Sequence, residues 1–231
     1  MEHILLQKRW FSVNRFNIRR ISVIAMFSAV SFLCVLAGRV VPNIAGFLSY
    51  DPKDALIVIA GFTLGPLAAL VITVLVSVIE MLSVSNTGIY GLIMNVFSTC
   101  AFALPAAFIY KYKRNLKGAI LGLASGMFSM SACMVLWNYI ITPFYMGVDR
   151  SVVAGMLFSV FLPFNLIKAG LNLGLALLIY KPLVLALRKA RLIPQGNAAV
   201  KKAGLQIAIS LFSLFLLGAF VVLFLVLAKI I

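Results

Sequence analysis

Three polar side chains share one face of a long apolar stretch in the second half of the chain. Asn165, Lys168 and Asn172 stand at positions i, i+3 and i+7 of LPFNLIKAGLN, a spacing that a helix brings to one side. A lysine at mid-membrane depth costs roughly 2.5–3.5 kcal/mol on insertion scales. We therefore interpret Lys168 as the marker of a binding site, in which a guest molecule completes the polar face. The alternatives are a structural lysine bonded to helix carbonyls and a lysine that reaches the membrane interface.

Other polar and aromatic residues are expected in the outer half of neighbouring helices. Asn95 and Asn138 offer amide donors and acceptors, and Trp137 can enclose a flat ring. Taken singly, Trp137 also fits an interfacial aromatic belt, and Glu80 fits a salt bridge as well as a binding site. Together they predict an outward-opening pocket for a small, largely uncharged molecule, covered by an outer loop at 42–53.

The composition requires a membrane environment for these elements. Hydrophobic residues make up 64% of the 231 residues, and the mean hydropathy is +1.13. A soluble domain of this size does not bury that much apolar surface. The apolar runs are too long and unbroken for alternating barrel strands, so we expect an all-α integral membrane protein.

The basic residues indicate topology rather than nucleic-acid binding. Of the 20 Lys and Arg residues, 15 fall in the blocks 8–20, 111–117 and 181–202 between apolar runs. Such blocks face the cytoplasm. The N-terminus is therefore expected inside, with every basic block on the inner side of a multi-pass chain.

Periodicity and breakers predict a six-helix transmembrane bundle plus an extra C-terminal transmembrane helix. The expected helices lie at 21–41, 54–64, 67–82, 89–110, 118–141, 151–187 and 205–228. The corresponding organisation is a basic cytoplasmic segment at 1–20, a membrane domain at 21–187, a basic linker at 188–204 and the additional helix within 205–231. If successive helices alternate in direction across the membrane, the chain crosses it seven times.

The sequence offers little support for enzymatic chemistry. It contains no P-loop motif, and His3 is its one histidine, so no metal set or histidine base can be assembled. Cys34, Cys100 and Cys133 lack metal or redox spacing and are interpreted as packing residues. We expect no enzyme, no cofactor and no metal. Glu80 alone is also a thin basis for the carboxylate relay of a proton-coupled transporter.

Several motifs resemble, in chain order, the riboflavin-specific substrate-binding (S) subunits of energy-coupling-factor (ECF) vitamin transporters. The motifs are LSYDPKDALIVIAGFTLGP, EMLSVSNTG with GLIMN, WNYIITPFY and LPFNLIKAGLN, and the likeness covers about 19–190. Ala25 and Ala29 form a small-xxx-small pattern, which permits close helix approach. The family has a similar AxxxA on its first helix, where it meets the coupling transmembrane subunit. The family core has six helices, so the C-terminal helix is a departure.

The resemblance implies a subunit of a bacterial cell membrane that captures riboflavin from outside. A transmembrane coupling subunit and two ATPase subunits then drive release inside. The ligand-binding residues of the family correspond to Asn138, Asn165 and Lys168, with lid residues near Leu48 and a contribution from the turn at 80–88. Three alternatives stay open: an S subunit for another vitamin such as thiamin or biotin, a stand-alone secondary transporter, and a membrane scaffold without a ligand. We expect no chain of carboxylates within the membrane, and this expected absence disfavours the secondary transporter.

Overall fold

The computed structural model describes residues 18–44, 48–193 and 203–228, and side chains from 209 onward in the last range. The predicted basic segment up to residue 17 and most of the predicted linker, 194–202, lie outside the described residues. The helices are α2 Ile18–Gly38, α3 Lys53–Leu64, α4 Pro66–Ser83, α5 Gly88–Tyr112, α6 Leu116–Met146, α7 Arg150–Met156, the π-helical turn η1 Leu157–Phe161, α8 Leu162–Lys189 and α9 Ala203–Leu227. The all-α membrane architecture is confirmed.

Six helical segments in the described part of the chain are long and apolar enough to cross a membrane. They are α2, α4, α5, α6, the segment Arg150–Lys189 and Ile209–Leu227 of α9. With 12 residues, α3 is about 18 Å long, which is less than the roughly 30 Å of a hydrocarbon core. Helix α3 is therefore too short to cross by itself, but its last residue, Leu64, lies beside Arg20 at the start of α2, so α3 and the segment before it together return the chain to the end of the bundle where α2 begins.

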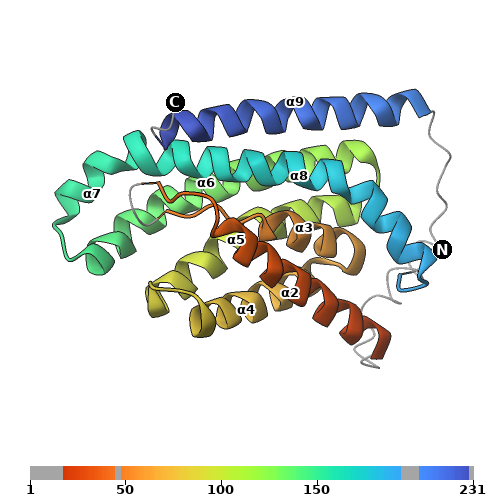
Figure 1. Cartoon of the computed structure of the whole chain (residues 1–231), viewed down its shortest axis with the longest axis horizontal. Helices are drawn as coiled ribbons and strands as arrows, with labels where there is room; N and C mark the ends of the chain where they lie inside the picture. The colour runs from red at the N-terminus through yellow and green to blue at the C-terminus, as the bar shows by residue number, and fades with distance from the viewer. Residues whose placement is uncertain (1–17, 45–47, 194–202, 229–231) are drawn as a thin grey trace.

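Helix α3 lies in the centre of the bundle rather than at its surface. Its residues from Lys53 to Gly61 are all buried, and it contacts α2, α4, α5 and α8 (Figure 1). The helix ends at Gly65, whose φ of 98° belongs to the left-handed region that favours glycine. Pro66 follows at the first turn of α4, where its missing N–H costs nothing.

Small residues let the neighbouring helices approach closely. On α6, a Cβ added at Gly122 would lie 2.7 Å from the carbonyl oxygen of Ala106 on α5. A Cβ at Gly126 would lie 2.3 Å from the carbonyl oxygen of Phe102. Because lipid is as apolar as the helix surfaces, such close van der Waals packing replaces the hydrophobic effect as the cohesive force.

The last helix of the predicted core is interrupted where the sequence has a proline. The continuous helix expected at 151–187 consists of α7, the π-helical turn η1 and α8, with Pro163 in the first turn of α8. A proline cannot donate to the carbonyl four residues earlier, and its ring crowds that carbonyl. A π-helical turn in the preceding residues accommodates this mismatch.

One end of the bundle gathers the basic blocks that the structure describes. The Arg20 guanidinium donates to the carbonyl of Leu64, which brings the start of α2 to the end of α3. Phe62 stacks on Tyr110 near the end of α5, and the Tyr110 hydroxyl bonds that of Tyr180 on α8. The basic residues at 18–20, 111–117 and 181–191 therefore lie near a common end, as the predicted topology requires.

Helix α9 packs along α8, on the opposite side of the molecule from α2 and α4 (Figure 1). Its outer face is apolar and exposed, for example at Phe212 and Phe215. Such a surface suits contact with lipid.

Candidate functional site

A group of buried charged residues surrounds the start of α3. Asp51, Lys53 and Asp54 are 3%, 1% and 0% exposed, although Asp51 lies in the segment that connects α2 to α3 and the other two only begin α3. Charged side chains are this deeply buried only when they are paired or hydrogen-bonded. The connecting segment therefore enters the bundle and delivers its charges to the interior.

Ion pairs connect the start of α3 and the segment before it to two helices, α4 and α8. The Lys168 ammonium on α8 donates to Asp51 Oδ2 at 2.9 Å. The Lys53 ammonium lies 2.5 Å from Glu80 Oε2 on α4 and 3.8 Å from Asp51 Oδ2. Arg39, just after α2, lies 3.7 Å from Glu80 Oε1. We call the set of Arg39, Asp51, Lys53, Asp54, Glu80 and Lys168 the charge cluster; its three positive and three negative groups balance.

Hydrogen bonds extend the charge cluster on two sides, while Asp54 Oδ2 has no partner among the described residues. The Thr99 hydroxyl on α5 donates to Asp54 Oδ1 at 2.7 Å. The Asn172 amide donates to the carbonyls of Asp51 and Lys168, both at 3.1 Å, and its oxygen accepts from the Ala55 amide at 3.2 Å. Asn172 thus ties α8 to the first turn of α3.

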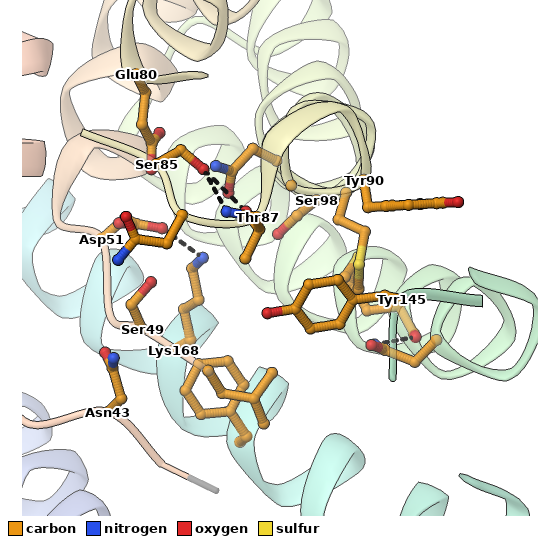
Figure 2. A pocket seen from close by; sticks show the side chains of 18 of the residues that line it. Asn43, Ser49, Asp51, Glu80, Ser85, Thr87, Tyr90, Ser98, Tyr145 and Lys168 are labelled. Atoms are coloured by element: carbon orange, nitrogen blue, oxygen red, sulfur yellow. Dashed lines mark hydrogen bonds and ion pairs between the residues drawn. The ribbon is translucent and has the colours of Figure 1, made fainter. Parts of the chain in front are cut away.

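A cavity of about 180 Å³ lies next to the charge cluster (Figure 2). Asp51 and Lys168 meet at one side of it, and Tyr90 and Tyr145 lie across from them. The cavity is lined by Arg39, Asn43, Leu48, Ser49, Asp51, Glu80, Ser85, Asn86, Thr87, Tyr90, Gly91, Met94, Asn95, Ser98, Met134, Asn138, Tyr145, Phe164, Asn165 and Lys168. Its volume exceeds the roughly 150 Å³ of a protein cavity that admits benzene, so it is large enough for an aromatic ring.

Several polar groups in the cavity wall keep hydrogen-bonding capacity. Asn165 donates to the carbonyl of Phe161 at 2.8 Å, and its amide oxygen has no hydrogen bond to another described residue. Asn138 donates to the carbonyl of Met134 and accepts from Thr142, which leaves one donor hydrogen and one lone pair. The buried Ser98 hydroxyl has no partner among the described residues. These groups can serve a ligand that has both donors and acceptors.

The structure brings together most of the sequence-predicted site residues, namely Leu48, Glu80, Asn95, Asn138, Asn165 and Lys168. Two others lie elsewhere. The polar atoms of Asn172 are used in the contacts between α8 and α3, and Trp137 packs against Phe97 with ring centroids 4.1 Å apart. Neither residue lines the cavity.

The expectation that a guest molecule completes the environment of Lys168 needs correction. Asp51 supplies the lysine with a charged acceptor from within the chain. The assumed absence of an intramembrane group of carboxylates is also wrong, because Asp51, Asp54 and Glu80 are all buried in the membrane domain. The available signal was the DPKD stretch, which places three charges directly before the apolar run ALIVIAGF.

Several known proteins to which the chain is similar are membrane transport components. Residues 19–180 match the family model of the ECF transporter substrate-specific component. Three curated relatives are "Riboflavin transporter FmnP" of Bacillus subtilis, at 28% identity over 66% of this chain and 85% of its own length, and two proteins named "Riboflavin transporter RibU". One is from Staphylococcus aureus, with 27% identity over 74% of this chain and 93% of its own length. The other is from Streptococcus thermophilus, with 31% identity over 76% of this chain and 88% of its own length.

A solved structure extends the likeness to the fold. It is described as the S component of a bacterial ECF transporter and shares 28% identity with this chain, with a TM-score of 0.63. The match covers 73% of this chain and 97% of the solved chain.

The pairing of Lys168 with Asp51 can be tested through stability. Asp51→Ala leaves a buried ammonium without its acceptor, and we expect the free energy of unfolding to fall by about 3–5 kcal/mol. Asp51→Ala combined with Lys168→Met removes both charges and should recover most of this loss. The measurement is denaturant unfolding in detergent micelles. Asp149→Ala, at an exposed carboxylate, is the control and should change stability by less than about 0.5 kcal/mol. Equal losses in the single and double variants would contradict the pairing.

Proposed function

The chain belongs to the family of ECF transporter substrate-specific components, and we propose that it captures riboflavin, or a close flavin, from the extracellular side of a bacterial cell membrane. The cavity beside Lys168 is the observation on which this proposal depends, because it joins unsatisfied amide groups to apolar walls. The similar proteins named riboflavin transporters select the flavin among the possible ligands.

The chemistry of a flavin suits this cavity. An isoalloxazine ring is flat and apolar on its faces, and its edge carries carbonyl acceptors, ring nitrogens and an N–H donor. Leu48, Met134 and Phe164 offer apolar contacts for the faces. Asn138 and Asn165 offer amide groups for the edge, because an amide side chain carries both the donor and the acceptor that the ring edge requires. The hydroxyl-rich lining around Ser49 and Ser85 suits the ribityl chain.

Transport then requires partners, which we infer from the family. An S component carries no ATPase of its own, so a transmembrane coupling subunit and two ATPase subunits are expected to supply the energy. We place the N-terminus in the cytoplasm, because the described residues of the three basic blocks lie near one end of the bundle. Ala25 and Ala29 are exposed on α2 and present small side chains to the membrane. This face suits close approach of a partner helix, and we propose it as the docking surface.

The alternative of a stand-alone secondary transporter gains some support from the buried carboxylates. However, Asp51 and Glu80 are held by lysines, an arrangement that fixes the charges in place rather than freeing them to carry protons. The S component is therefore the function that the geometry favours.

Flavin binding is tested by quenching of riboflavin fluorescence on the purified protein. We expect saturable quenching, weakened about tenfold by Asn165→Ala, since a hydrogen bond contributes roughly 0.5–1.5 kcal/mol. Phe164→Ala should also weaken binding, because it removes an apolar wall of the cavity. Phe158→Ala is the matched control, since its ring is 74% exposed on the same segment and should leave binding unchanged.

Two outcomes would contradict flavin binding. The first is the absence of saturable quenching in the natural protein. The second is displacement of the bound flavin by thiamin or biotin at equal concentration, which would indicate an S component for another vitamin.

The docking surface is tested by co-purification with the coupling subunit. Leucines in place of Ala25 and Ala29 should hold a partner helix away, so we expect co-purification and ATP-dependent riboflavin uptake to fall while flavin binding is kept. Ala132→Leu, at an exposed position of α6, is the control. Undiminished co-purification of the Ala25→Leu, Ala29→Leu variant would refute the docking role. Uptake into liposomes by this chain alone would instead support the stand-alone transporter.

A further inference from the structure

Helix α9 lies beyond residues 19–180, the part of the chain that matches the family model. It is nevertheless not a detached helix, because it packs along α8, which carries Asn165 and Lys168 (Figure 1). Its role therefore has to be found in its own contacts.

Two glycines of α8 form the surface on which α9 rests. A Cβ added at Gly170 would lie 2.2 Å from Cζ of Phe220, well inside the van der Waals contact distance of two carbon atoms. A Cβ at Gly174 would lie 3.0 Å from Cγ of Leu217. The Gly-xxx-Gly pair thus gives α9 a fixed position against α8, set by close packing.

One helical turn beyond Phe220, α9 reaches the segment that enters the bundle. Phe224 is 5% exposed, and its ring centroid lies 6.3 Å from that of Tyr50 at an interplanar angle of 61°. This edge-to-face geometry is one that aromatic pairs prefer. Phe224 also belongs to a buried apolar cluster with Ile44, Leu48, Val153, Phe161, Phe164, Ile167 and Leu171.

These contacts lead directly to the ligand site. Tyr50 precedes Asp51, the acceptor for Lys168, and Leu48 and Phe164 line the cavity. We propose that α9 is a positioning element for this site: Phe224 holds Tyr50, and through it keeps Asp51 opposite Lys168 and Leu48 over the cavity. This inference rests on the proposed flavin-binding function. In it, the contacts of α9 slow the dissociation of the bound flavin.

The test compares two phenylalanines of the same helix. Phe224→Ala should raise the riboflavin dissociation rate roughly three- to tenfold, the range that corresponds to loss of an aromatic pair. Phe215→Ala removes the same ring from the lipid-facing side, where it is 72% exposed, and should leave the rate unchanged. Stopped-flow recovery of riboflavin fluorescence after mixing the complex with an excess of a non-fluorescent flavin analogue, which occupies the emptied site, measures the rate. Equal rates in the two variants would overturn the proposal.

A double-variant cycle shows whether Phe224 acts through Tyr50. If it does, Phe224→Ala should accelerate dissociation much less in a Tyr50→Ala background than in the natural protein. Rate changes that simply multiply would mean that α9 supports the fold without positioning this segment, and would overturn the proposal.

A second readout needs no ligand. The amide of Leu48 donates to the carbonyl of Ile44 at 2.9 Å, and that of Ala55 donates to Asn172. Phe224→Ala should increase hydrogen exchange at both amides roughly three- to tenfold, whereas Phe215→Ala should not. If the natural protein does not bind riboflavin, the proposed function fails, and this exchange measurement alone decides the positioning role. Unchanged exchange in Phe224→Ala would overturn it.

Discussion

The ion pair between Lys168 and Asp51 is the constraint on which the rest of the site depends. Neither charge could be left alone at this depth, because an unpaired charge inside a membrane domain is costly. Pairing them requires the segment after α2 to enter the bundle. The same arrangement accounts for the short, central α3, which begins with these charges already buried and therefore does not need to span the full thickness of the membrane by itself.

The cavity follows from the same arrangement. The connecting segment meets α8 at the charge cluster and leaves a space between itself, α5 and α6, where Asn138 and Asn165 retain free hydrogen-bonding groups. Because the lining charges Arg39, Asp51, Glu80 and Lys168 all take part in ion pairs, the unsatisfied groups of the wall are amides and a hydroxyl, which suits a ligand that is polar but uncharged in its ring. The two flanks of the domain then differ: α2 presents small exposed residues, and α9 covers the glycine surface of α8.

The sequence was sufficient for the helices and for part of the site. Hydropathy and breakers such as Gly65 placed the helix ends within a few residues, and the spacing of Asn165 and Lys168 placed both in the cavity wall. The partner of Lys168 could not be found in this way, since Asp51 lies 117 residues earlier and periodicity describes only local neighbours. For the same reason Asn172 shares the helical face of Lys168 but uses its polar atoms to hold α3. Trp137 has a side chain of the type that binds flat rings, but in the structure it packs against Phe97 and does not line the cavity.

The most direct measurement is an experimental structure of the purified protein with riboflavin bound. We expect the isoalloxazine ring inside the cavity, in contact with Phe164 and Asn165, while Asp51 stays within hydrogen-bonding distance of Lys168. Two results would contradict this expectation. One is a flavin bound outside this cavity, and the other is a Lys168 that pairs with neither Asp51 nor any other group of the connecting segment.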